Sequence, residues 1–194
     1  PARPGGSLTA LYTGRLDTFK GASLAIRAMA HLPEWTLLVV GGGPEEDRHR
    51  QLARRTGVEE RVRFLGWRSR DEVLGILRSE ADVMIFPSLH EEGGMAVAEA
   101  VEAGVPVVAL DRGGPPALGA HAIRAGSVES TVADLAKATR ALYGTVPIAP
   151  RRLDVVSVRA EVRAILAETG MLPLVSEGNA PAGVAIPTGV SSSR

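Results

Sequence analysis

The sequence of 194 residues contains no cysteine, carries no net charge and has no long hydrophobic run. Without cysteine the chain forms neither a disulfide framework nor a thiolate zinc site, which permits an intracellular location. The 22 basic and 22 acidic residues balance, which argues against a nucleic-acid-binding protein with a broad basic face. The apolar runs at 37–40 and 105–110 are far shorter than the ~20 residues that a membrane-spanning helix needs. These absences favour a globular protein that binds no nucleic acid.

Short apolar segments alternate with amphipathic segments along most of the chain. Strands are predicted at 8–13, 35–40, 62–65, 83–86 and 105–110, with a weaker strand at 122–124. Helices are predicted at 21–31, 45–56, 69–79, 95–103, 131–143 and 155–168. Continuously apolar strands separated by amphipathic helices are typical of a parallel sheet covered on both faces. Right-handed connections then give a doubly wound, Rossmann-like α/β fold.

The composition changes near the C-terminal end. Residues 171–194 are rich in Pro, Gly, Ala and Ser and show no periodicity. Such segments bury too little apolar surface to offset the entropy of ordering. We therefore predict one domain at residues 7–170 and a disordered tail at 171–194.

Glycines follow four of the predicted strands, at Gly14, Gly41–Gly43, Gly93–Gly94 and Gly113–Gly114. In a parallel sheet these positions share the carboxyl edge, where open α/β sheets bind ligands. The triple glycine lacks the third glycine of a dinucleotide fingerprint, and no Walker A sequence occurs. The glycines thus predict a binding crevice but disfavour NAD or ATP bound by those standard routes.

Two cations, Arg15 and Lys20, lie on either side of the turn after the first predicted strand. A guanidinium and an ammonium group suit a diphosphate, although two such cations alone are more often solvated surface. The amides of Gly94, Met95 and Ala96 begin a predicted helix, whose positive end favours an anion. The combination predicts a diphosphate site.

Two glutamates accompany this site, Glu91 in the loop before the helix and Glu99 on a small apolar helix face. An ionised carboxylate there is costly unless hydroxyls, amides or cations satisfy it. A carboxylate accepts two hydroxyl hydrogen bonds, so Glu99 suits the 2′ and 3′ hydroxyls of a ribose. Glu91 would face the part of the ligand beyond the diphosphate. The alternatives are a structural ion pair for Glu99 and a solvated loop position for Glu91.

With these residues identified, the chain resembles the C-terminal, donor-binding half of a GT-B fold, family 4 retaining glycosyltransferase over residues 8–143. The motifs that carry the resemblance are Gly14-Arg15-Leu16 with Lys20-Gly21, Val39 to Pro44, Arg61 to Gly66, Pro87-Ser88, Glu91 and Glu99 with seven residues between them, Gly104 to Val108, and Gly113-Gly114. The chain departs from the family where Glu92-Gly93-Gly94 follows Glu91 in place of Gly-Phe-Gly, and where Ala117 follows Pro116 in place of a glutamate.

The resemblance implies transfer of a sugar from a nucleotide-diphosphate sugar with retention of the anomeric configuration, with no cofactor and no metal. The roles that it implies are diphosphate binding by Gly14, Arg15, Lys20, Gly94, Met95 and Ala96, ribose binding by Glu99, a catalytic position for Glu91 at the donor sugar, and a border to the base at Trp67 and Arg68. The alternatives are a catalytically inactive nucleotide-sugar-binding module, another GT-B enzyme such as a sugar-nucleotide epimerase, and a non-enzymatic Rossmann-like scaffold.

A GT-B enzyme has two such domains, so the resemblance implies that this chain is a single half-domain and that an N-terminal acceptor domain is missing. The chain alone should then transfer little or no sugar. A cytoplasmic location is expected. The basic run Arg48, Arg50, Arg54 and Arg55 is interpreted as a solvated helix face. The alternative is a patch peripheral to the membrane, because many such enzymes act on lipid-linked acceptors.

Overall fold

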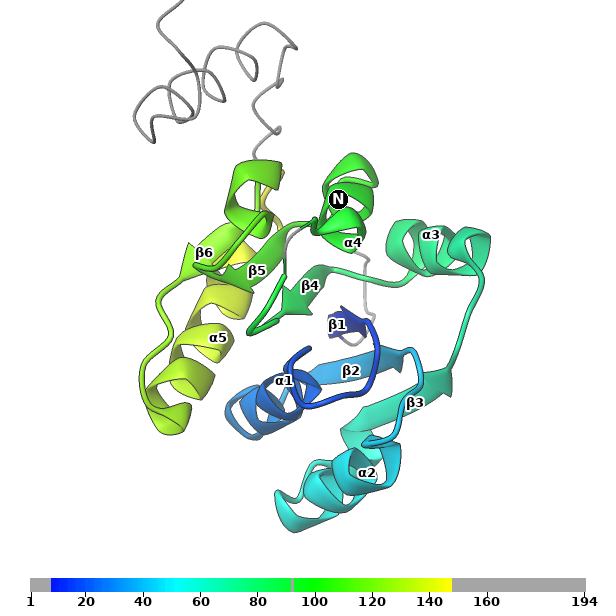
Figure 1. The fold of residues 1–194 in the computed structure, drawn as a ribbon, viewed down its shortest axis with the longest axis vertical. Coiled ribbons are helices and arrows are strands. Elements are labelled where there is room, and N and C mark those ends of the chain that lie inside the picture. Colours follow the sequence, from blue (N-terminus) through cyan, green and yellow to red (C-terminus); the bar gives the residue numbers. More distant parts are fainter. Residues whose placement is uncertain (1–7, 92, 148–194) are drawn as a thin grey trace, which may run out of the picture. The chain divides into compact units, whose positions relative to one another are not determined.

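The computed structural model describes residues 8–91 and 93–147 (Figure 1). The predicted helix at 155–168 and the predicted disordered tail at 171–194 lie outside these residues. The strands are β1 (Leu8–Thr13), β2 (Trp35–Val40), β3 (Val62–Gly66), β4 (Val83–Phe86), β5 (Val107–Leu110) and β6 (His121–Ile123). The α-helices are α1 (Ala22–Ala28), α2 (Glu46–Arg55), α3 (Arg70–Ser79), α4 (Met95–Glu102) and α5 (Val128–Leu142). Short 3-10 turns occur at Met29–His31, Glu59–Arg61 and Pro115–Leu118.

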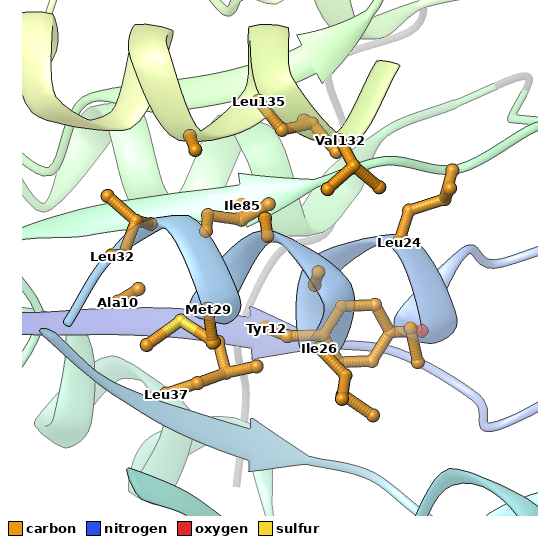
Figure 2. Close-up of a cluster of buried hydrophobic side chains, with 14 of the residues drawn as sticks. Ala10, Tyr12, Leu24, Ile26, Met29, Leu32, Leu37, Ile85, Val132 and Leu135 are labelled. Carbon is orange, nitrogen blue, oxygen red and sulfur yellow. The ribbon is translucent and has the colours of Figure 1, made fainter. Parts of the chain in front are cut away.

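The six strands form one sheet in the order β3-β2-β1-β4-β5-β6, and every neighbouring pair is parallel. Side chains alternate between the two faces along each strand. Tyr12 and Ile85 belong to a core beneath α1, α2 and α5 (Figure 2). Leu11 and Met84 belong to the opposite core, beneath α3 and α4. Because helices cover both faces, the predicted doubly wound α/β fold is confirmed.

The strand order reverses between β1 and β4, which lie side by side at the centre of the sheet (Figure 1). The chain leaves β1 toward β2 and β3, then returns to add β4 on the other side of β1. The connections after these two strands therefore diverge and open a crevice at their carboxyl ends, the usual ligand position in such sheets. The predicted cations follow β1, and Glu91 follows β4.

Three boundaries differ from prediction by two residues or more, each for a local reason. β5 begins at Val107 rather than at residue 105, because Pro106 has no amide hydrogen to donate to the sheet. α5 begins at Val128 rather than at residue 131, since Ser127 caps it by accepting the Ser130 amide at 3.2 Å. The helix predicted at 21–31 ends at Ala28 and continues as a 3-10 turn.

Arg61 supports the edge of the sheet from within the segment that carries part of the family resemblance. Its guanidinium donates to the carbonyl oxygens of Leu32 at 2.7 Å, Trp35 at 3.0 Å and Met29 at 3.0 Å. Met29 begins the 3-10 turn after α1, Leu32 follows that turn, and Trp35 begins β2. Arg61 therefore has a structural role: it ties the start of β3 to the connection between α1 and β2, which lies 26 to 32 residues earlier in the chain.

Candidate functional site

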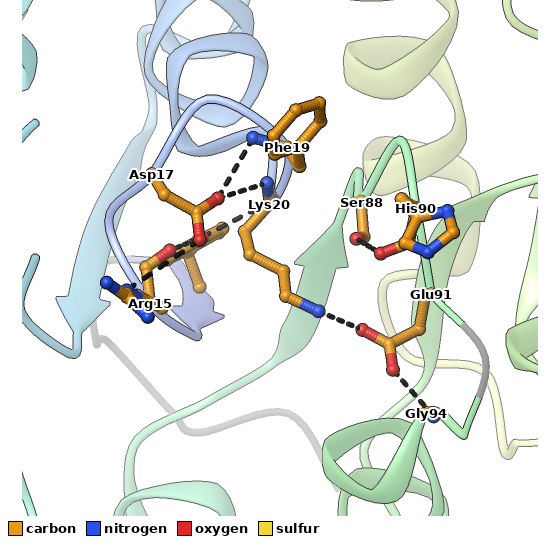
Figure 3. Close-up of polar contacts among 9 residues, drawn as sticks. Arg15, Asp17, Phe19, Lys20, Ser88, His90, Glu91 and Gly94 are labelled. Atoms are coloured by element: carbon orange, nitrogen blue, oxygen red, sulfur yellow. Dashed lines mark hydrogen bonds and ion pairs between the residues drawn. The ribbon is translucent and has the colours of Figure 1, made fainter.

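The turn after β1 is held in shape by two side chains. Asp17 Oδ1 accepts hydrogen bonds from the amides of Phe19 at 2.9 Å and Lys20 at 3.0 Å (Figure 3). The buried Tyr12 hydroxyl donates a shared hydrogen bond to the carbonyl oxygens of Arg15 and Lys20, at 3.2 and 3.3 Å. Burial raises the pKa of Tyr12, with a smaller contribution from Asp17, so the hydroxyl keeps its proton. The turn thus presents its two cations in a fixed backbone.

The triple glycine after β2 serves this turn through backbone contact. A Cβ on Gly41 would lie 2.0 Å from the Gly14 carbonyl oxygen, and one on Gly43 would lie 2.4 Å from that of Leu16. The Leu16 amide also donates to the Gly42 carbonyl at 3.0 Å. Here glycine allows a second backbone, rather than a ligand, to approach closely.

Lys20 and Glu91 meet across the crevice. Lys20 Nζ lies 2.8 Å from Glu91 Oε2, and the Gly94 amide donates to Glu91 Oε1 at 2.9 Å (Figure 3). The Glu91 side chain is only 15% exposed. Burial opposes its ionisation, yet the hydrogen bonds from Lys20 and Gly94 outweigh this and hold the pKa of Glu91 below its usual value. The ion pair joins the connections that follow β1 and β4.

The loop that carries Glu91 is fixed from two directions. The Leu89 amide donates to the Phe19 carbonyl at 2.8 Å, which ties the loop to the cationic turn. Gly113 has φ 66°, and a Cβ there would lie 1.7 Å from the Glu91 carbonyl oxygen. The Gly114 amide donates to the same oxygen at 3.3 Å. Three connections at the carboxyl edge therefore position this glutamate.

α4 begins beside the ion pair. Gly94, with φ 69°, precedes its first residue and accepts the amides of Val97 and Ala98 at 2.8 and 3.1 Å. Within the described part of the chain, the amides of Met95 and Ala96 have no acceptor. These two donors and the positive helix end favour an anion at this position.

Two cavities at the carboxyl end of β1 gather nine of the ten predicted site residues. One, of about 260 Å³, is lined by Thr13, Gly14, Lys20, Phe86, Glu91, Gly93, Gly94, Met95 and Ala96. The other, of about 380 Å³, is lined by Thr13, Gly14, Arg15, Val40, Gly41, Gly42, Trp67, Arg68 and Val73. The cavities share Thr13 and Gly14, so they adjoin. Arg15 and Trp67 are 70% and 76% exposed, and among the described residues the Arg15 guanidinium contacts Asp17 alone, at 3.9 Å.

Glu99, the tenth residue, lines neither cavity. Its Oε1 accepts from Arg70 Nε at 2.5 Å, and its side chain is 15% exposed. Arg70 is the first residue of α3. The neighbouring helix α3 therefore supplies a cationic partner for this carboxylate. Ribose binding by Glu99 stays a prediction.

Sequence reasoning did not identify three supporting residues, Tyr12, Asp17 and Arg70. Asp17 has a recognisable signal, because an aspartate two residues before the amide it accepts is typical of a turn. From the sequence, Tyr12 is predicted to be an ordinary core residue of β1, with no sign that its hydroxyl binds the turn. Arg70 gives no signal, since its contact with Glu99 depends on how α3 and α4 pack.

The basic run on α2 is largely neutralised by carboxylates. Arg48 pairs with Glu45 at 3.0 Å, Arg50 with Glu46 at 2.7 Å, and Arg54 with Glu59 at 3.2 Å. Arg50 also lies over the Phe64 ring. This pairing favours the interpretation as a solvated helix face.

Over residues 8–91 and 93–147, no helix is long and apolar enough to span a bilayer. The same residues contain no group of three or more metal-ligating His, Cys, Asp or Glu side chains.

Comparison with known proteins identifies a matching family and several glycosyltransferases as relatives. Residues 1–144 match the family model described as glycosyl transferases group 1. D-inositol 3-phosphate glycosyltransferase of Corynebacterium glutamicum strain R is 37% identical over 115 residues, which cover 54% of this chain and 27% of the relative. The chain thus matches about a quarter of the length of this curated relative.

Solved structures of GT-B glycosyltransferases share the fold. WaaG, a glycosyltransferase involved in lipopolysaccharide biosynthesis, has 26% identity and a TM-score of 0.58, with 84% of this chain and 43% of that chain covered. Anabaena HepE in complex with UDP-glucose has 24% identity and a TM-score of 0.58, with 84% and 49% covered.

Proposed function

The chain belongs to the glycosyl transferases group 1 family, and we propose that it is the C-terminal, donor-binding half of a family 4 enzyme. The whole enzyme would transfer a sugar from a nucleotide-diphosphate sugar to an acceptor with retention of the anomeric configuration. The observation that carries the proposal is the cluster of Lys20, Glu91 and the start of α4 at the point where the strand order reverses.

The diphosphate is proposed to bind between the cationic turn and α4. Lys20 and the amides of Met95 and Ala96 line one cavity, and Arg15 lines the adjoining one. Gly14 lines both, where the absence of a side chain leaves room for the phosphates. Cations and fixed amides would stabilise the diphosphate as it departs from the sugar, which is the largest source of catalysis that such a site offers.

Glu91 would then lie against the donor sugar. Its present partner, Lys20, is also the proposed diphosphate ligand, so an arriving diphosphate competes with the carboxylate for the ammonium group. The released carboxylate accepts hydroxyl hydrogen bonds beside the anomeric carbon, and the acceptor attacks the same face of the sugar from which the diphosphate leaves. Glu99 is assigned the ribose, and Trp67 and Arg68 the border of the base.

The acceptor is proposed to bind on a second, N-terminal domain. Phe19, Trp67 and Met95 are 63%, 76% and 68% exposed, and all three follow the carboxyl ends of strands. Large apolar side chains exposed together at one edge suit contact with a partner or substrate. A lipid-linked or membrane-surface acceptor and a cytoplasmic location remain predictions.

The first test is binding of UDP-, GDP- and ADP-glucose by the 194-residue chain in a thermal-shift panel. UDP-glucose is the first donor to test, because the HepE structure of the same fold holds it. We expect one of the three to raise the melting temperature, and stabilisation by none would overturn the proposal.

The second test addresses catalysis in the full-length protein. Donor hydrolysis or transfer should be measurable with added EDTA and be lost in Glu91→Ala. A full-length protein that binds the donor but neither hydrolyses nor transfers it would instead be a nucleotide-sugar-binding module.

A further inference from the structure

We propose that Arg70 is a positioning residue, which orients the Glu99 carboxylate for the two vicinal hydroxyls of the donor ribose. This inference rests on the proposed function. Arg70 would act through Glu99 and set the preference of the site for ribonucleotides over 2′-deoxyribonucleotides.

The contact between the two side chains has one defined geometry. Arg70 Nε donates to Glu99 Oε1 at 2.5 Å, and within the described residues Glu99 Oε2 has no hydrogen-bond partner. A carboxylate has about four lone-pair positions. Arg70 therefore occupies one of them and leaves the second oxygen to accept hydroxyl groups.

The burial of the two residues is unequal. The Glu99 side chain is 15% exposed, whereas that of Arg70 is 67% exposed. Fixing an ion pair at a surface contributes little to folding. By holding Oε1 of the nearly buried Glu99, however, Arg70 determines the direction in which Oε2 points. Recognition of ribose hydroxyls depends on that direction.

The start of α3 is itself held in place. Ser69 caps the helix in a capping box, in which its hydroxyl accepts the Glu72 amide at 3.3 Å and Glu72 Oε2 accepts the Ser69 amide at 2.8 Å. Arg70 is the next residue, so its backbone is fixed relative to the preceding segment. The Arg70 side chain therefore extends toward α4 from a backbone position that the helix cap fixes.

Arg70 also connects two parts of the proposed donor site. It follows Trp67 and Arg68, which line the larger cavity and are assigned the border of the base. Its partner Glu99 lies on α4, whose first residues line the smaller cavity. In a nucleotide the ribose lies between the base and the diphosphate. The contact between Arg70 and Glu99 likewise lies between the segment assigned to the base and the helix assigned to the diphosphate.

The test compares UDP with 2′-deoxy-UDP by calorimetric titration of the 194-residue chain. We expect the wild type to bind UDP roughly tenfold more tightly, the effect of one hydrogen bond to a charged group. Arg70→Ala should reduce this ratio to about two or less, and Arg70→Lys should restore part of it. Arg78→Ala, a change of an exposed arginine at the other end of α3, is the matched control and should keep the wild-type ratio.

A double-mutant cycle separates positioning from general destabilisation. In the Glu99→Gln background, Arg70→Ala should change the UDP preference no further, and the melting temperature of Arg70→Ala should stay close to that of the wild type.

The positioning role is wrong if Arg70→Ala keeps the full preference for UDP. It is also wrong if Arg70→Ala tightens UDP binding, because Arg70 would then compete with the ribose for the Glu99 carboxylate. Equal wild-type affinities for UDP and 2′-deoxy-UDP would also overturn it while leaving the diphosphate site intact. A wild type that binds no nucleoside diphosphate would overturn the proposed function as well.

Discussion

Lys20 and Glu91 lie 71 residues apart in the sequence and form a 2.8 Å ion pair across the centre of the sheet. One follows β1 and the other follows β4, the two strands between which the strand order reverses. The cation proposed for the diphosphate and the carboxylate proposed for the sugar therefore already contact each other. When a donor binds at this site, Lys20 would exchange the Glu91 carboxylate for the diphosphate, and Glu91 would exchange Lys20 for hydroxyl groups of the sugar.

Removing either cation should weaken diphosphate binding. We expect Lys20→Ala and Arg15→Ala each to lower UDP affinity roughly tenfold, the value of a charge-assisted hydrogen bond. Calorimetric titration measures this. Lys137→Ala is the control, because Lys137 is the only other lysine of the chain and is exposed on α5. Unchanged affinity in both site variants would contradict the assignment.

Glu91 should make stability depend on pH. Its pKa is lowered by folding, so its contribution is present above the unfolded value of about 4.5 and is lost as the pH falls through the folded value. Urea unfolding should show that the wild type loses on the order of 1 kcal/mol more than Glu91→Gln between pH 6 and pH 3. Parallel pH profiles for the two proteins would argue against an ion pair in solution.

Gly113 should tolerate no side chain. A Cβ there would lie 1.7 Å from the Glu91 carbonyl oxygen, whereas Gly57, at φ 69°, faces open space. Gly57→Ala should cost about 1 kcal/mol of unfolding free energy for its backbone strain alone. Gly113→Ala should cost at least about 3 kcal/mol, since the Glu91 loop must also move. Equal losses in urea unfolding would show that this loop yields easily.

Arg61 should matter for stability and not for donor binding. Arg61→Ala removes the donors to three carbonyl groups and should lower the free energy of unfolding by roughly 3 kcal/mol. Arg63→Ala, an exposed change two residues away on β3, should cost less than about 0.5 kcal/mol. The UDP affinity of folded Arg61→Ala should equal that of the wild type, and a large loss of affinity would assign Arg61 a role in the site.

The sequence predicts most elements because the sheet is buried on both faces. β1, β2 and β4 have the predicted bounds, since these strands are buried on both faces and are therefore largely apolar, and polar, glycine or proline residues mark each end. The hydrophobic pattern does not predict the order of the strands in the sheet, because that order depends on which side of β1 the chain places β4 after it leaves β3. That crossing is what brings Lys20 to Glu91.

The partners of the site residues were harder to predict than the residues themselves. Glycines, cations and a helix start indicate an anion site from local sequence alone, and the structure brings them to adjoining cavities. The pairing of Glu99 with Arg70 depends on the packing of α3 against α4. The sequence could therefore state that Glu99 needs a cation or a ligand, and could not say which.

The end of α5 limits how far the protein can be trimmed for crystallisation. Tyr143 lies edge-on against Trp35, with the ring centroids 5.7 Å apart and the planes at 84°. Trp35 belongs to the core beneath α1, α2 and α5, and the partly buried Tyr143 packs against that core. A product cut before residue 143 would uncover a tryptophan at the start of β2 and expose an apolar surface prone to aggregation. Limited proteolysis should accordingly spare Tyr143 for as long as the sheet stays folded.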